Sequence, residues 1–113
     1  MNMLIGMKQN ECMTAASLPV ELLERMASVL RVLAHPHRLK IIELLEREKH
    51  GPVSRIQAVL GLPQAVTSQH LGHMKRVGLL ASTRQGKEVW YAIADRRALT
   101  ILGCIRKKHG GTK

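Results

Sequence analysis

The chain has 113 residues, the size of one small domain in which a single copy can bury only a modest core. Its 18 Lys and Arg residues against 8 Asp and Glu residues give a formal net charge of +10, which favours a polyanionic partner, either nucleic acid or an anionic membrane surface. No apolar run matches a membrane span or a signal peptide, and two cysteines are too few for a secreted disulfide scaffold. We therefore expect a cytoplasmic protein with no membrane partner.

The first half of the chain is predicted to be helical. Residues 1–16 are expected to form a flexible arm, after which Ser17 can cap a helix that runs to about Leu33. The apolar stripe of this helix is wide, which indicates more than one packing partner. His35 is pushed out of helical conformation by Pro36, so a second helix is predicted from Pro36 to about Arg47, with residues 49–52 as a break.

Two short helical patterns separated by Gly61-Leu62-Pro63 lie at the centre of the sequence. Gly61 can adopt the left-handed conformation that ends a helix, and Pro63 presets the dihedral angle that begins the next one. The second pattern, residues 64–77, alternates apolar positions with hydrogen-bonding side chains and contains no acid. Such a face suits the DNA major groove, so we interpret residues 53–77 as a helix-turn-helix whose second helix reads DNA. Taken alone, the stretch fits an ordinary helical hairpin with a solvated face equally well.

The last third is predicted to contain a hairpin and a final helix. Residues 80–84 and 88–93 read as strands around a turn in which Gly86 supplies a positive φ, and Arg84 and Lys87 place cations at the tip. Asp95 can cap a last helix that ends near Lys108, and residues 110–113 are a tail. The predicted fold class is mainly α with a small β-hairpin, a winged helix-turn-helix in the order α-α-α-α-β-β-α over residues 17–109.

Four segments together resemble the ArsR/SmtB family of bacterial winged-helix repressors. They are residues 33–45, 64–71, 77–80 and 86–93, and the match covers residues 20–108. The resemblance implies a homodimer formed by the first and last helices, which would explain their apolar stripes. It also implies that two reader helices enter successive major grooves of a pseudo-palindromic operator in double-stranded DNA.

The DNA-reading positions of this family fall on one stretch of the reader helix: Gln64, Ala65, Thr67, Ser68, Gln69 and His70. Gln64 or Gln69 can hold an adenine edge in a bidentate pair, and hydroxyl groups suit either a base or a phosphate. Arg84 and Lys87 would follow phosphates or the minor groove. His70 has an alternative role as a half-buried residue that hydrogen-bonds a neighbour.

The sequence offers few sites for an effector. Members of the family bind metal through cysteines on the helix before the turn, and residues 51–56 contain none. In a second family site on the last helix, Asp95 is present but the next ligand positions carry Arg97 and Lys108, which repel cations. His35, His37, His50 and His109 lie scattered over helix starts and loops. We therefore expect no metal site and no cofactor.

Cys12 and Cys104 are the remaining candidates for sensing, because the dimer interface can bring the arm and the last helix together. Lys107 and Lys108 favour a thiolate at Cys104, whereas the helix C-terminus opposes it. Oxidation or persulfidation of this pair can release DNA. The alternatives are arsenite or another soft metal as the effector, and no effector at all, with Cys104 a buried small hydrophobe.

The sequence therefore favours a homodimeric, sequence-specific DNA-binding regulator, in the simplest form a repressor. A non-specific architectural nucleic-acid-binding protein can use the same basic surface, although only Trp90 and Tyr91 are available for base stacking. An enzyme is not expected, because no nucleophile, base and orienting acid can be assembled from these residues.

Overall fold

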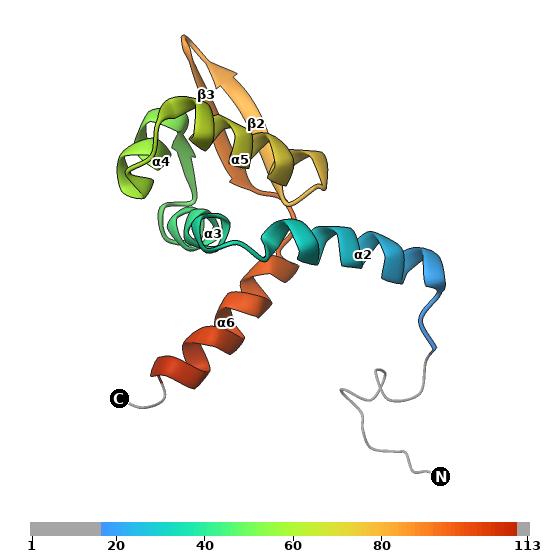
Figure 1. The fold of residues 1–113 in the computed structure, drawn as a ribbon. Helices are drawn as coiled ribbons and strands as arrows, with labels where there is room; N and C mark the ends of the chain where they lie inside the picture. Colours follow the sequence, from blue (N-terminus) through green and yellow to red (C-terminus); the bar gives the residue numbers. More distant parts are fainter. Residues whose placement is uncertain (1–16, 111–113) are drawn as a thin grey trace.

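A computed structural model describes residues 17–110, and the predicted arm with Cys12 lies outside the described residues (Figure 1). The elements follow in the order α2 Val20–Leu33, α3 Pro36–Glu48, β1 His50–Pro52, α4 Val53–Leu60, α5 Gln64–Arg76, β2 Leu80–Gln85, β3 Glu88–Ile93 and α6 Arg97–Gly110. This order confirms the predicted mainly α fold with a β-hairpin wing. None of the described helices combines the length and apolarity that crossing a membrane requires.

Prolines determine where the first two helices begin. Helix α2 starts at Val20 with Pro19 at its N-cap, and no side chain caps it, so the predicted cap at Ser17 is wrong. The Pro19 carbonyl accepts the first helical bonds instead, from the N–H groups of Leu22 and Leu23 at 3.1 Å. The next helix, α3, begins at Pro36, as predicted. His35 is extended, with φ −157° and ψ 129°, and caps α3 because its Nδ1 accepts from the His37 backbone N–H.

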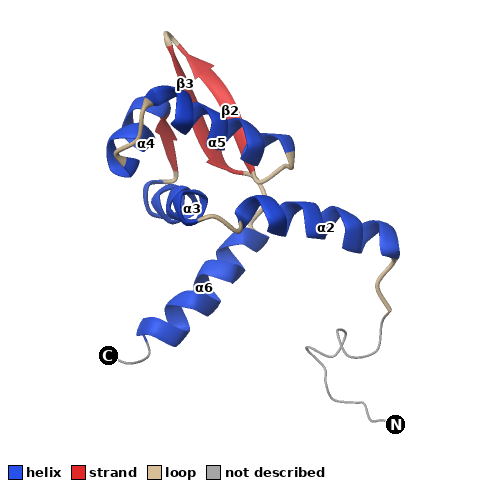
Figure 2. Ribbon diagram, viewed as in Figure 1, coloured by secondary structure: helices blue, strands red, loops and turns tan. Residues whose placement is uncertain are grey.

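Strand β1 is an element that the sequence did not predict, because residues 49–52 were expected to be a break. It pairs antiparallel with β3, with His50 opposite Ala92 and Pro52 opposite Trp90. The sheet order is β1-β3-β2, so β3 is central and Pro52 lies on an edge strand, where a residue without an N–H is tolerated (Figure 2). The formation of so short a strand depends on backbone pairing with β3 rather than on a side-chain pattern in its own sequence.

The wing is a tight hairpin between β2 and β3. Gln85 pairs with Glu88, which leaves Gly86 and Lys87 as the two turn residues. Gly86 has φ +66°, the conformation that the prediction required of it. The cation Lys87 therefore stands at the tip of a hairpin of fixed register.

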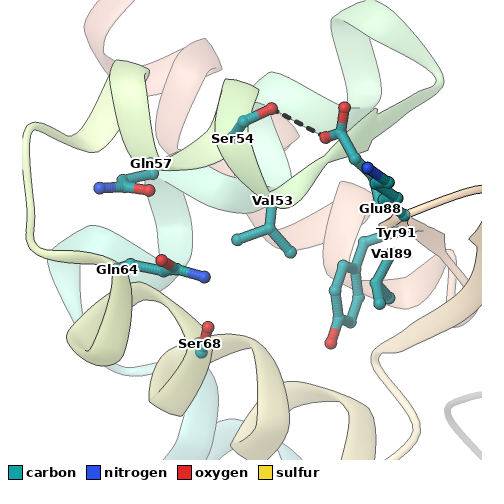
Figure 3. Close-up of a pocket in the computed structure, with 9 residues that line it drawn as sticks. Val53, Ser54, Gln57, Gln64, Ser68, Glu88, Val89 and Tyr91 are labelled. Carbon is teal, nitrogen blue, oxygen red and sulfur yellow. Dashed lines mark hydrogen bonds between the residues drawn. The ribbon is translucent and has the colours of Figure 1, made fainter.

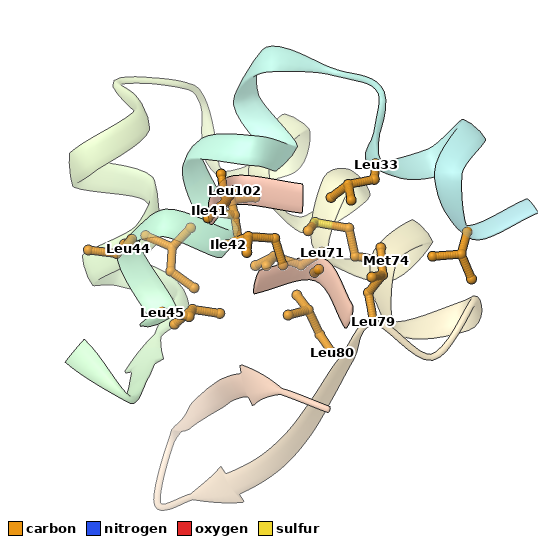
Figure 4. Close-up of a cluster of buried hydrophobic side chains, with 13 residues drawn as sticks. Leu33, Ile41, Ile42, Leu44, Leu45, Leu71, Met74, Leu79, Leu80 and Leu102 are labelled. Carbon is orange, nitrogen blue, oxygen red and sulfur yellow. The ribbon is translucent and has the colours of Figure 1, made fainter. Parts of the chain in front are cut away.

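The core is aliphatic and gathers where α3, α5 and α6 meet the base of the sheet (Figure 4). Its largest fully buried side chains are Ile41, Ile42, Leu44, Leu45, Ile56, Leu71, Met74, Leu79 and Thr67. Leu71 and Met74 belong to α5, so burial of this one face fixes the rotation of the helix about its axis. The opposite face of α5 must then point outward.

Candidate nucleic-acid interface

Helix α5 divides into a buried and an exposed face. Thr67, His70, Leu71 and Met74 are buried, whereas Gln64, Ala65, Ser68 and Gln69 are exposed. The buried positions recur at intervals of three and four residues, which is the spacing of one helical face. The exposed face therefore presents two amides, a hydroxyl and a methyl group without any acid.

The turn before α5 leaves its N-terminus accessible. Gly61 adopts the left-handed conformation, with φ 69° and ψ 31°, and its N–H bonds to the Gln57 carbonyl at 2.9 Å. Pro63 occupies the N-cap of α5, and no side chain caps this end of the helix. The N–H groups of the first turn carry partial positive charge and point at what lies before the helix, which suits a phosphate.

A cleft of about 410 Å³ separates the beginning of α5 from the wing (Figure 3). Gln64 and Ser68 of α5 face this cleft, and Tyr91 of β3 lines its far side. Glu88, the acid nearest the wing tip, accepts a hydrogen bond from the Ser54 hydroxyl at 2.9 Å. Polar side chains of the reader helix and the wing thus border one continuous concave surface.

The charges around this surface are unbalanced. Elsewhere on the described chain, acids take nearby cations as partners: Lys40 with Glu43, Arg55 with Glu48, Arg97 with Asp95 and Arg106 with Glu46. Within residues 17–110, no salt bridge involves the cations of the reader helix and the wing, which are Lys75, Arg76, Arg84 and Lys87. Lys87 lines the cleft itself, and cations without an acidic partner match the phosphate backbone of a duplex.

Two of the predicted DNA contacts are corrected by burial. The Thr67 side chain is 0% exposed, and its hydroxyl donates to the Pro63 carbonyl at 3.1 Å. The hydroxyl is therefore satisfied within α5, and the Thr67 side chain has no surface to offer to DNA. His70 is only 8% exposed, and its Nδ1 accepts a hydrogen bond from Arg38. The alternative prediction for His70, a residue that bonds a neighbour, is the arrangement observed.

Arg38 joins three helices at the back of the reader helix. Its Nε donates to His70 Nδ1 at 3.0 Å, its Nη1 donates to the Val32 carbonyl at 3.0 Å, and its Nη2 lies 2.9 Å from His73 Nδ1. Burial lowers the pKa of His70, and the nearby His35 and Arg38 lower it further. The neutral ring can accept from Arg38, so the network holds α5 against α2 and α3. Sequence periodicity did not reveal this role of Arg38.

Only one of the two cysteine candidates for sensing lies within the described residues. Cys104 of α6 is exposed in the single chain, and Cys12 lies outside the described residues. The structure instead brings together His35, His37 and His70, whose potential ligand atoms all lie within 4.8 Å of one another. The sequence separates these histidines by up to 35 positions, so only the tertiary packing of α5 reveals the cluster.

Known proteins share both the sequence and the fold. A family model described as a helix-turn-helix domain matches residues 33–83. The transcriptional repressor PagR of Bacillus anthracis is 45% identical over 80 residues, which cover 71% of this chain and 80% of PagR. The HTH-type transcriptional repressor SmtB of Mycobacterium tuberculosis is 38% identical over 93 residues, which cover 81% of this chain and 68% of SmtB.

Solved structures agree with these relatives. The crystal structure of PagR matches with a TM-score of 0.70 at 37% identity, covering 77% of this chain and 99% of that chain. The homodimeric winged helix-turn-helix DNA-binding domain of Mb0332 from Mycobacterium bovis matches with a TM-score of 0.72 at 26% identity, covering 88% of this chain and 95% of that chain. The chain therefore belongs to the ArsR/SmtB family of winged helix-turn-helix DNA-binding transcriptional regulators.

Proposed function

We propose that the protein is a homodimeric repressor that binds a pseudo-palindromic operator in double-stranded DNA. The observation that carries this proposal is the exposed, acid-free face of α5 beside a wing whose cations have no salt-bridge partner within the described residues. The names of PagR and SmtB describe both relatives as transcriptional repressors, which supports the direction of regulation.

The exposed residues of α5 and the wing have distinct chemical roles in this proposal. Gln64 and Gln69 offer amides that can pair with adenine edges, and Ser68 offers a hydroxyl to a base or a phosphate. Ala65 suits contact with a thymine methyl group. Arg84 and Lys87 neutralise phosphates, which contributes affinity without sequence preference.

Dimerisation follows from apolar surface that the single chain leaves uncovered. Leu23 and Leu30 of α2 and Ile105 of α6 are each about half exposed, at 47%, 48% and 48%. An apolar groove of about 270 Å³ runs between these helices, lined by Leu30, Leu33, Ala34, Leu39, Ile101 and Ile105. A second copy related by a twofold axis would cover the surface and present two reader helices to one duplex. The Mb0332 domain, described as homodimeric, supports this arrangement.

Operator selection followed by binding measurements tests the proposal. We expect the full chain to enrich a short inverted repeat from random duplexes and to bind it with an affinity that falls steeply with salt. Gln69→Ala should reduce the preference for the selected site, whereas Lys87→Ala should weaken all duplexes alike. Arg47→Ala, at an exposed cation on α3, is the matched control. Equal affinity for random duplexes would instead indicate the architectural alternative.

The same assay tests release by thiol chemistry. Cys104 is exposed on α6, with Arg106 and Lys107 following it, so an oxidant or polysulfide can reach the sulfur in the single chain. We expect peroxide or polysulfide to lower operator affinity and Cys12→Ser or Cys104→Ser to abolish that response. A response to arsenite alone would favour the soft-metal alternative, and no response to any of these reagents would remove sensing by the thiols.

A further inference from the structure

Three histidines from separate parts of the sequence meet behind the reader helix. His35 precedes α3, His37 lies in its first turn, and His70 is at the middle of α5. Their ring centroids are 4.6 Å apart for His35 and His70, 5.4 Å for His35 and His37, and 5.8 Å for His37 and His70. The site is partly enclosed, because His70 is buried and the other two are half-buried.

The triangle of rings matches the size of a tetrahedral metal centre. With zinc–nitrogen distances of about 2.0–2.1 Å, three histidine ligands hold their ring centroids roughly 5 Å apart. The observed separations of 4.6 to 5.8 Å bracket that value. The ligand nitrogens lie within 4.8 Å of one another, and a tetrahedral centre needs about 3.3 Å, so the rings must turn toward one another to converge on one ion.

We propose that His35, His37 and His70 bind one divalent first-row transition cation of the Zn²⁺ type, with water at the fourth position. The described cluster contains imidazoles alone, and imidazole suits Zn²⁺, Ni²⁺ and Cu²⁺, whereas Mg²⁺ and Ca²⁺ require oxygen ligands. The site needs neither cysteine, which distinguishes it from thiol sensing.

Hydrogen bonds to two of the rings, and the positive charge of Arg38 beside His70, compete with the cation. His35 Nδ1 accepts from the His37 backbone N–H at 3.1 Å, and His70 Nδ1 accepts from Arg38 Nε at 3.0 Å. A ring that accepts a hydrogen bond at Nδ1 carries its proton on Nε2. A metal at Nδ1 displaces the donor, and a metal at Nε2 moves the proton to Nδ1, where the ring can no longer accept. Either geometry breaks the α3 cap and the Arg38 bond to α5.

This competition couples the cation to the position of the reader helix. Arg38 holds α5 against α2 and α3, and metal binding would release its bond to His70 while drawing His70 toward His35 and His37. The cation should therefore weaken operator binding, and DNA should weaken metal binding by the same factor. This second step rests on the proposed function, whereas binding of the cation does not.

Metal titration of the untagged full chain tests the site. We expect one Zn²⁺ per chain by competition with a chromophoric chelator, and tetrahedral d–d absorption when Co²⁺ is used as the probe. His37→Gln and His70→Gln should each weaken Zn²⁺ binding at least tenfold. His50→Gln, at an exposed histidine outside the cluster, and the Cys12→Ser/Cys104→Ser double variant should bind Zn²⁺ as the native chain does. Circular dichroism checks that each variant is folded.

Zinc binding that survives both cluster variants, or that disappears in the cysteine variant, would overturn the assignment. For the coupling, we expect Zn²⁺ to lower the operator affinity of the native chain at least tenfold. His37→Gln should bind the operator as the native chain does and lose the response, because the His37 side chain makes no described contact with Arg38. Zinc binding without operator binding would overturn only the proposed function, and operator binding without zinc binding would overturn only the metal site.

Discussion

The guanidinium of Arg38 serves three acceptors at once. It donates to the Val32 carbonyl of α2 and to His70 Nδ1 of α5, and its Nη2 lies 2.9 Å from His73 Nδ1. Among residues 17–110 it forms no salt bridge, so its described side-chain contacts are to a carbonyl and to two imidazoles. A planar fork with five N–H donors can make these contacts together, whereas the single ammonium of a lysine cannot.

Arg38→Lys should therefore lower the free energy of unfolding by about 2 kcal/mol, because charge-assisted hydrogen bonds are lost while the charge stays half-buried. Urea unfolding followed by circular dichroism measures the change. Arg47→Lys, at an exposed position of the same helix, should stay within about 0.5 kcal/mol of the native chain. If the two variants are equally stable, the three contacts of Arg38 contribute nothing to the fold.

For a single residue, the sequence predicts which face of a helix the side chain lies on better than it predicts which residues the side chain contacts. Helical spacing from Leu71 and Met74 is sufficient to place Gln69 on the exposed face, whereas Gln64, seven residues before Leu71, is exposed because the first turn of α5 borders the open cleft. The same spacing places Thr67, four residues before Leu71, with the buried residues, so its burial is predictable from the pattern. The histidine cluster could not be predicted from the sequence, because His35 and His70 meet only through the packing of α3 against α5.

Helix α6 shows how one side chain begins an element. Asp95 Oδ1 accepts from the Arg97 backbone N–H at 3.0 Å, and the carboxylate also pairs with the Arg97 guanidinium. The hydrogen bonds from Arg97 lower the pKa of the Asp95 carboxyl, and burial opposes them only in part. Because the folded-state pKa is depressed, this stabilisation is present above the unfolded-state pKa and is lost as the pH falls through the folded-state value.

Asp95→Ala should lower the free energy of unfolding at pH 7 by about 1 kcal/mol, the usual effect of removing an N-cap. Asp95→Asn keeps a capping oxygen and should lose less. For both variants the difference from the native chain should shrink as the pH falls below about 4, where the Asp95 carboxyl of the unfolded chain becomes protonated while the depressed pKa keeps the native carboxyl charged. Urea unfolding at several pH values checks this, and a difference that stays constant with pH would show that the charge of Asp95 has no part in the stabilisation.

Elements marked by proline and glycine were the most predictable. Pro36, Gly61 and Gly86 each stand at a boundary or turn that the structure reproduces. Strand β1 was not predicted because its three residues are too few to show an alternation of apolar and polar side chains. They form a strand only because their backbone groups pair with those of β3. The start of α2 was misplaced because a proline carbonyl, rather than the Ser17 side chain, receives its first bonds.

The whole molecule has a core from which α2 and α6 project in different directions (Figure 1). Both helices carry apolar side chains beyond the core, and an apolar groove runs between them. In a chain of this size, uncovered apolar surface lowers solubility unless a partner buries it. The proposed dimer would use this surface to hold two DNA-reading faces at a fixed separation, so dimerisation and operator affinity depend on the same side chains.

A charge placed in this groove should separate the copies. Leu30→Glu on α2 and Ile105→Glu on α6 each leave a carboxylate that a dimer interface would have to desolvate without a partner, so both variants should sediment as monomers at micromolar concentration. Operator affinity should fall at least tenfold, because the two half-sites are then bound independently. Ala58→Glu, at an exposed position of α4, should leave the oligomeric state unchanged. Analytical ultracentrifugation distinguishes these outcomes, and dimers that persist in both groove variants would place the interface on another surface of the molecule.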